Sequence, residues 1–416
     1  LFSPNHVPGL YEAFGMPEFD SLYLKYEKDK SIPKQTIGAQ ELFQALLKER
    51  AETGRIYIMN LDHCNTHSSF KDKVYMSNLC QEITLPTTPV QHIDDKEGEI
   101  ALCILSAINL GLLSDMDELE ELCDLSVRAL DEIIDYQEYP VEAAKISTQA
   151  RRSLGIGYIG LAHYLAKNQV GYEDKKALKL VDKITEAFQF YLLKASNNLA
   201  KEKTKCLWFE KTKYSDGILP IDTYKKELDE IVKRDYTYDW EWLRKEIKEH
   251  GLRHSTLSAQ MPSESSSVVS NATNGVEPPR DYLSVKKSKK GPLKQIVPDY
   301  NRLKNYYTLL WDMKGNEGYI NIIAVMQKYF DQAISGNWSY NPENYKDGEV
   351  PLSVMAQDLL TTYKLGWKTA YYQNTYDAKS DIDEPVHPVG WHDGVEETLE
   401  EKKKEDDEEN CDACAI

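Results

Sequence analysis

Two long segments carry apolar residues at helical spacing, and this pattern constrains the fold more than any other feature. The apolar positions are Leu119, Leu122, Leu125, Ala129 and Ile133 in one segment and Leu180, Ile184, Phe188 and Leu192 in the other. A period of three to four residues places such side chains on one face of a helix. Short β-rich pieces, at 55–60 and 368–376, lie outside these segments. Helices combined with short strands predict an α/β fold.

Composition separates one large folded region from a tail. The 416 residues carry a net charge of −18, and residues 393–416 alone hold 11 acidic residues against 3 lysines. After residue 376 the helical and strand periodicity ends and Pro, Gly and Asp become frequent. We therefore expect a folded domain at 1–376 and a flexible acidic tail at 377–416. The negative charge disfavours direct binding to nucleic acid.

No run of 18 apolar residues occurs, and the N-terminal stretch lacks the pattern of a signal peptide. We expect a cytoplasmic protein without a membrane span. The seven cysteines form an odd count, which indicates free or redox-active thiols. Cys123 and Cys206 have apolar neighbours and are expected to be small buried side chains. The segment "DHCNTH" at 62–67 lacks a second ligand pair at zinc-site spacing, so we expect no metal site.

Three further segments have distinctive composition. "GIGYIG" at 155–160 fits the dinucleotide fingerprint, but the polar and basic stretch before it is unlike a buried strand, so a helix-packing or tight-turn role is expected. The basic cluster at 280–294 is expected to form a solvated hairpin turn. The serine- and asparagine-rich stretch at 255–275 is interpreted as a functional loop.

The segment "SNLCQE" at 77–82 places Cys80 between an amide and a carboxylate. In an extended segment, Asn78, Cys80 and Glu82 share one face. A carboxylate can accept a proton, an amide can hold a hydroxyl, and sulfur can act as a nucleophile or one-electron carrier. Cys103 adds a second thiol in an apolar setting. The alternative is a structural cysteine in a strand, and spacing does not exclude it.

Two weaker features lie near the C-terminus. Tyr371 and Tyr372 are adjacent in a β-like segment, where neighbours point to opposite faces; they are either core residues or redox-active tyrosines. Cys411 and Cys414 form a C-x-x-C pair, a spacing that suits disulfide exchange. A flexible chain from Asn374 to Cys411 reaches roughly 30 to 40 Å. Such an arm can serve a buried site, although a metal-binding or incidental pair is equally compatible with the spacing.

Taken together and in order, these motifs resemble the C-terminal half of the large catalytic subunit of class I aerobic ribonucleotide reductase. "SNLCQEITLPT" is similar to the family's radical-cysteine loop, and "GEIALCILSAINLG" to the segment carrying one reducing cysteine. "MPSESSSVVSNATNGVEPPR" is similar to the substrate-phosphate loop, "YYQNT" to the tyrosine relay, and the tail to the thiol shuttle.

The resemblance implies a reaction: ribonucleoside diphosphates become 2′-deoxyribonucleoside diphosphates for DNA replication. A radical from the di-iron tyrosyl centre of a separate small subunit would pass through Tyr372 and Tyr371 to Cys80. The Cys80 thiyl radical would remove the 3′ hydrogen of the substrate. Glu82 would take the 3′-hydroxyl proton and Asn78 would hold the ribose hydroxyls.

The remaining roles also follow from the resemblance. Cys103 and a partner thiol would reduce the 2′ position, and Cys411 with Cys414 would reduce the resulting disulfide and be recharged by thioredoxin or glutaredoxin. The phosphate pocket would be lined by Ser263, Glu264, Ser265 and Ser266, with Ser265 standing where the family pattern has Thr. No cofactor is expected in this chain, whereas the holoenzyme would bind ATP.

The family implies a ten-stranded α/β barrel made of two five-stranded halves, of which this chain would supply the second half and the central cysteine loop. The segment bearing the partner of Cys103 is not recognisable here. We therefore expect a companion chain, as for a split gene product, and no activity without it. The alternatives are a non-catalytic structural or regulatory half, a thiol–disulfide oxidoreductase acting only through Cys411 and Cys414, and a glycyl-radical reductase, for which no glycyl-radical motif is found.

Overall fold

The computed structural model describes residues 1–288 and 291–377. Its helices are α1 (Leu10–Ala13), α2 (Phe19–Lys28), α3 (Ala39–Thr53), α4 (Leu61–Thr66), α5 (Met116–Tyr136), α6 (Glu142–Arg151), α7 (Leu161–Lys167), α8 (Lys175–Glu202), α9 (Pro220–Thr223), α10 (Trp240–His250), α11 (Glu264–Val269), α12 (Tyr300–Leu303), α13 (Glu317–Gln327) and α14 (Leu352–Lys364). Its strands are β1 (Ile58–Met59), β2 (Ile104–Asn109), β3 (Leu154–Ile159), β4 (Leu283–Ser288), β5 (Gly291–Ile296), β6 (Trp338–Tyr340), β7 (Thr369–Ala370) and β8 (Gln373–Thr375). The mixture confirms the predicted α/β class.

Extended segments lie side by side in chain order at the centre of the described residues. β2 pairs with β3 in parallel, and β3 is bonded to residues 256–260, where Ile156 N donates to Leu257 O at 2.8 Å. Residues 256–260 are bonded in turn to residues 332–335, where Gln260 N donates to Ala333 O at 3.1 Å. β6 continues from that segment and pairs in parallel with β8. Parallel neighbours joined through helices are the βαβ arrangement of an α/β protein.

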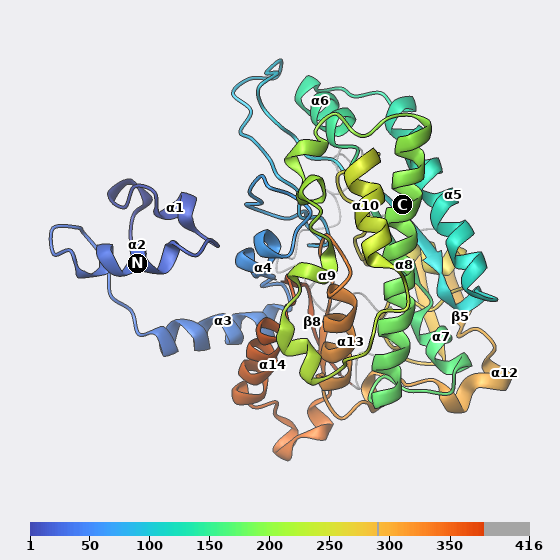
Figure 1. Ribbon diagram of the computed structural model, residues 1–416. Helices are drawn as coiled ribbons and strands as arrows, with labels where there is room; N and C mark the ends of the chain where they lie inside the picture. Colours follow the sequence, from blue (N-terminus) through green and yellow to red (C-terminus); the bar gives the residue numbers. More distant parts are fainter. Residues whose placement is uncertain (289–290, 378–416) are drawn as a thin grey trace, which may run out of the picture.

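Helices cover this layer of strands. α8 packs against α5, α10 and α13, and it lies in the middle of the helical layer in Figure 1. Both long helices predicted from apolar spacing are confirmed, but two of the apolar residues named for α5 do not face the core. Leu125 and Ile133 are exposed, whereas Cys123, Val127 and Leu130 are buried. Leu119, Cys123, Val127 and Leu130 follow one another at steps of three or four residues and therefore form one face of α5, and this is the face that is buried.

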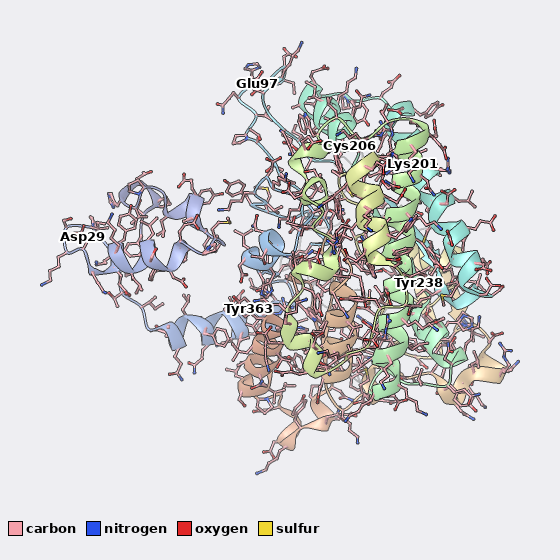
Figure 2. The ribbon with its side chains drawn as sticks, in the orientation of Figure 1. Asp29, Glu97, Lys201, Cys206, Tyr238 and Tyr363 are labelled. Carbon is pink, nitrogen blue, oxygen red and sulfur yellow. The ribbon has the colours of Figure 1, made fainter. Side chains whose placement is uncertain are left out.

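Two buried cysteines and a hairpin agree with their predictions. Cys123 and Cys206 are buried, as predicted, and Figure 2 shows Cys206 in the helical layer. The hairpin predicted within 280–294 is confirmed as the antiparallel pair β4–β5. α1 and α2 lie apart from the main body in Figure 1, and Asp29 marks this part in Figure 2. No helix among the described residues is long and apolar enough to cross a membrane.

The glycine-rich segment at 155–160 differs from its prediction. Gly155 and Gly157 lie inside β3, in which every residue is buried, and only Gly160, at φ +76°, forms a turn, as the N-cap of α7. A Cβ on Gly157 would stand 2.7 Å from the Ala259 carbonyl oxygen. The glycines therefore permit close approach of the neighbouring segment. The polar stretch before them, which argued against a strand, belongs instead to α6.

The serine-rich stretch at 255–275 is also not a loop throughout. Residues 256–260 are part of the layer of strands, and α11 follows within the same stretch. Its polarity misled the prediction because the strand part is held by buried polar contacts.

Asp331 supplies the strongest of those contacts and ties residues 256–258 to the segment that follows α13. Its carboxylate accepts hydrogen bonds from Leu257 N at 2.9 Å, Ser258 N at 2.8 Å and the Tyr214 hydroxyl at 2.8 Å. The side chain is buried. Lys368 reinforces the same corner, because its buried ammonium donates to the carbonyls of Asp331 at 2.9 Å and Gln332 at 2.8 Å.

Replacing Asp331→Asn should lower the free energy of unfolding by about 3 kcal/mol, since an amide cannot accept all the bonds that the carboxylate accepts. Urea unfolding of the purified chain measures the change. Asp235→Asn, at an exposed position, is the matched control and should stay within about 0.5 kcal/mol of the parent. Equal stability of the two variants would contradict the role given to Asp331.

Candidate active site

Cys80 lies in a tight turn, so the prediction that residues 78–82 are extended is wrong. Gln81 N donates to Asn78 O at 3.2 Å, which closes a four-residue turn, and Gln81 adopts a left-handed backbone with φ 65°. The Asn78 side chain stabilises the turn, since its Oδ1 accepts from Ile83 N at 3.1 Å. Asn and Asp often close turns through such bonds. The turn therefore removes the strand alternation that would place Asn78, Cys80 and Glu82 on one face.

Glu82 still meets Asn78, but through this turn and not through strand alternation. The Glu82 side chain is buried, and burial raises its pKa, while hydrogen bonds from Asn78 and Ser335 oppose that shift. Ser335 donates to Glu82 Oε2 at 3.3 Å and also to the Cys80 carbonyl oxygen. Residues 333–335 thus hold the turn in place, and Ala333 N donates to Glu82 O at 3.0 Å.

The rings of Tyr371 and Tyr372 contact each other, and Tyr371 also contacts the Cys80 sulfur. The Tyr371 hydroxyl donates to Cys80 Sγ at 3.4 Å, and the two tyrosine ring centroids are 4.1 Å apart. The rings therefore do not point to opposite faces, as an unbroken strand would require. The chain leaves strand geometry between β7 and β8, and this break brings the rings together. Burial raises the pKa of Tyr371, and the contact with Cys80 raises it further.

Two residues near this pair were missed from the sequence. Tyr57 precedes β1, whose antiparallel register sets Ile58 opposite Ala370, so Tyr57 lies beside the pair with ring centroids 4.7 Å from Tyr371 and 5.3 Å from Tyr372. Arg50 of α3 is fully buried and donates to the Tyr371 carbonyl at 2.9 Å. In the sequence Arg50 resembles an ordinary charged helix residue, whereas "RIYIMN" at 55–60 at least marked a strand near Tyr57.

Cys103 immediately precedes β2, and its sulfur lies close to Gly155 of β3. Gln332 Nε2 donates to its sulfur at 3.5 Å. Burial raises the pKa of Cys103 to about 12, and this hydrogen bond opposes the shift while Glu82 and Asp331 add to it. The structure therefore brings Cys103 within the electrostatic influence of the Glu82 loop, as two reacting groups of one site require.

The predicted phosphate segment surrounds the start of α11. Ser263 is the N-cap residue of this short helix, and its hydroxyl donates to Met261 O at 3.2 Å, while Ser266 donates to Ser263 O at 3.3 Å. Glu264 and Ser265 form the first turn. Met261 follows residues 256–260, so the segment leaves the layer of strands next to residues 332–335.

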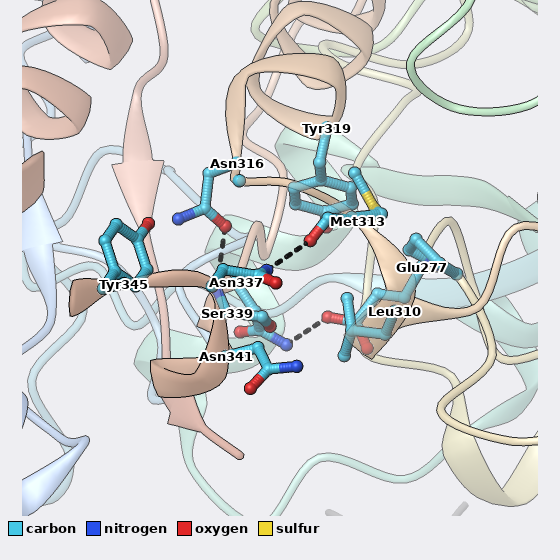
Figure 3. Close-up of a pocket in the computed structure, with 12 residues that line it drawn as sticks. Glu277, Leu310, Met313, Asn316, Tyr319, Asn337, Ser339, Asn341 and Tyr345 are labelled. Atoms are coloured by element: carbon cyan, nitrogen blue, oxygen red, sulfur yellow. Dashed lines mark hydrogen bonds between the residues drawn. The ribbon is translucent and has the colours of Figure 1, made fainter. Parts of the chain in front are cut away.

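A small cavity is lined by polar and apolar side chains, among them Asn316, Tyr319, Asn337 and Tyr345 (Figure 3). It encloses about 10 Å³, which is room for about one water. Asn337 links this cavity to the tyrosine pair, because its Oδ1 accepts from Tyr372 N at 2.9 Å and its Nδ2 donates to the half-buried Glu277. Neither residue was singled out from the sequence.

Both histidines of "DHCNTH" form hydrogen bonds with distant parts of the chain. His63 Nδ1 lies 2.8 Å from Trp367 O, and His67 lies 2.7 Å from Gln327 O and 2.8 Å from the Thr223 hydroxyl. Within residues 1–288 and 291–377, no cluster of three or more His, Cys, Asp or Glu side chains is arranged to hold a metal ion. Cys411 and Cys414 lie outside the described residues.

Residues 1–373 match the family described as ribonucleotide reductase, barrel domain. The chain belongs to this family. It is 59% identical to the alpha subunit of ribonucleoside-diphosphate reductase from Haemophilus influenzae, over 93% of this chain and 52% of that one. The corresponding figures are 57%, 95% and 53% for the alpha subunit of reductase 1 from Escherichia coli, and 43%, 92% and 51% for the alpha subunit from Enterobacteria phage T4. The chain spans about half the length of these relatives.

Replacing Glu82→Gln should stabilise the fold at neutral pH. Because burial raises the pKa of folded Glu82 above that of an exposed glutamate, the fold loses stability as the pH rises from the unfolded-state pKa through the folded-state pKa. Glutamine does not ionise. The gain in unfolding free energy should be present at pH 8 and disappear below about pH 4, where both forms are neutral. Urea unfolding across this range measures it. Glu121→Gln, at an exposed position, should show no such gain, and a destabilised Glu82→Gln protein at pH 8 would refute the expectation.

Proposed function

We propose that this chain is the catalytic part of a ribonucleoside-diphosphate reductase that forms 2′-deoxyribonucleoside diphosphates in the cytoplasm. The observation that carries the proposal is the contact between the Tyr371 hydroxyl and Cys80 Sγ at 3.4 Å, beside the ring of Tyr372, whose centroid is 4.1 Å from that of Tyr371. A structural cysteine needs no such partner. The family membership and the names of the relatives support the same reaction.

The tyrosine pair suits one-electron transfer coupled to a proton. A partner small subunit with a di-iron centre would supply the oxidising equivalent as a tyrosyl radical. Tyr372 passes it to Tyr371 between rings that are in contact, and the Cys80 thiol then gives a hydrogen atom to the Tyr371 oxygen. The raised pKa of Tyr371 keeps its hydroxyl proton in place at neutral pH. The Cys80 thiyl radical removes the 3′ hydrogen of the ribose.

Glu82 and Asn78 act on the ribose hydroxyls. A buried carboxylate with a raised pKa accepts a proton from the 3′-hydroxyl more readily than an exposed one does. Asn78, which already bonds to Glu82, holds the hydroxyls in position. The diphosphate is bound by Ser263, Glu264, Ser265 and Ser266 at the start of α11, through hydroxyls and backbone N–H groups.

Cys103 donates reducing equivalents together with a second thiol. Of the other cysteines among the described residues, Cys64 and Cys123 are buried and directed toward the carbonyls of Lys368 and Phe188. We therefore assign the second thiol to a companion polypeptide corresponding to the part of the relatives that this chain does not cover. That polypeptide would pair with β2, which has a strand partner on one side only among the described residues, and complete a ten-stranded barrel.

The test combines the chain, its companion, a small subunit and a dithiol reductant, and measures deoxyribonucleotide formed from a nucleoside diphosphate. Tyr371→Phe and Cys80→Ser should each lower turnover about a thousandfold or more, since each removes a group without which the sequence of steps stops. Tyr136→Phe, at a tyrosine that is 91% exposed, is the control and should retain activity. Substantial turnover by Tyr371→Phe would sink the proposed relay, and turnover without the companion would sink its requirement.

The tail is tested separately. Replacing both Cys411 and Cys414 by Ser should leave one turnover with prereduced enzyme and abolish sustained turnover with a protein dithiol such as thioredoxin or glutaredoxin, because only re-reduction requires the shuttle. Rapid-quench product yield per active site measures the first and steady-state rate the second. A simple oxidoreductase acting through the C-x-x-C pair would lose both, and that result would favour the alternative.

A further inference from the structure

Gln332 connects the Cys80 loop to Cys103, and both the oxygen and the nitrogen of its side-chain amide form hydrogen bonds. Its Oε1 accepts from Thr84 N at 3.2 Å, two residues beyond Glu82, while its Nε2 donates to Leu154 O at 2.9 Å and to Cys103 Sγ at 3.5 Å. The residue is fully buried. Thr84 offers only a donor there and Leu154 only an acceptor, so the amide has one orientation. The nitrogen must face the sulfur.

The sulfur also lies close to the backbone of β3. A Cβ on Gly155 would lie 3.0 Å from Cys103 Sγ, which is closer than such contacts normally come. Gly155 and the Gln332 amide are therefore both close neighbours of the sulfur. The charged groups that act on it are Glu82 of the cysteine loop and Asp331, next to Gln332, and both are acidic. Gln332 is the group that favours negative charge on this sulfur.

We propose that Gln332 is a positioning residue that holds the Cys103 sulfur and stabilises its thiolate during reduction of the active-site disulfide. A hydrogen bond to an ionised acceptor is stronger than one to a neutral acceptor, so the N–H acts mainly on the thiolate. The consequence for turnover rests on the proposed function, but the effect on the thiol itself does not.

The step is a thiol–disulfide exchange. The thiolate of a dithiol reductant attacks the sulfur bonded to Cys103, and the disulfide between that sulfur and Cys103 breaks. The electron pair leaves with Cys103 as a thiolate, and a mixed disulfide forms on the other sulfur, to be resolved by the reductant's second thiol. A leaving thiolate of lower pKa departs faster. Hydrogen-atom transfer from Cys80 places no charge on Cys103 and does not need this donor.

The test measures the alkylation rate of Cys103 by iodoacetamide as a function of pH, followed by peptide mass spectrometry, on the reduced full chain in its complex with the companion. Gln332→Met keeps the size of the side chain and removes the N–H. At pH 8 we expect alkylation about tenfold slower, with the profile moved to higher pH, because a change of one in pKa alters the thiolate fraction tenfold.

Gln260→Met is the matched control. Gln260 is equally buried and bridges neighbouring segments through its amide, since Nε2 donates to Tyr158 O at 2.9 Å and Oε1 accepts from Tyr158 N at 3.0 Å, but it does not bond to a sulfur. Its substitution should leave the Cys103 profile unmoved. An unchanged rate in Gln332→Met, or an equal fall in both variants, would overturn the proposal.

Gln332→Glu guards against misfolding, because it retains an acceptor for Thr84 N while replacing the donor at the sulfur. It should slow alkylation at least as much as Gln332→Met, and faster alkylation would refute the role. In turnover, both Gln332 variants should lower the steady-state rate more than they lower the yield of one prereduced turnover. If the parent enzyme gives no deoxyribonucleotide, the proposed function fails, whereas the alkylation profiles still decide the role of Gln332.

Discussion

The site depends on one short segment, residues 332–335, which is bonded on both sides. On one side it continues the parallel layer of strands through Gln260, and on the other it receives the Cys80 turn through Ala333 and Ser335. The Cys80 turn has no regular strand pairing of its own, so residues 332–335 determine where it lies. Lys368 fixes the same segment from outside through backbone carbonyls, and burial lowers its pKa to about 7. Placement of the sulfur is therefore a property of the whole layer and not of the cysteine loop.

Charge at the site is distributed in an unusual way. Glu82 is buried and accepts hydrogen bonds from Asn78 and Ser335. Arg50, which lies beside the tyrosine pair, instead donates to backbone carbonyls. A cation beside Glu82 would hold its proton affinity low. The neutral donors lower the pKa of Glu82 less than burial raises it, so ionisation of this carboxyl costs stability. The base proposed at this position therefore has a cost in the stability of the fold.

The sequence predicted the elements better than their contacts. Helical spacing located α5 and α8, and the order of motifs located Cys80, Glu82, Cys103 and the tyrosine pair in one region. It did not predict the turn at Cys80, because Gln81 is not a residue expected at positive φ.

The supporting residues were not predicted for a different reason. Tyr57, Arg50, Gln332 and Asn337 act through contacts between distant parts of the chain, such as Arg50 with Tyr371. No local pattern encodes such a contact. Arg50 is also polar, so that hydropathy assigns it to the surface.

Gly155 has a consequence of another kind. Most positions that touch a reactive group tolerate graded substitution, since a slightly larger or smaller side chain shifts the group only slightly. The space occupied by the Cys103 sulfur exists because β3 has a hydrogen atom there in place of a methyl group. An alanine Cβ would stand 2.6 Å from a methyl carbon of Leu105 and 3.0 Å from the Cys103 sulfur, so both neighbours would have to move. Sequence variation at this position therefore offers no small step through which to adjust the surroundings of this thiol, whereas the Gln332 amide does.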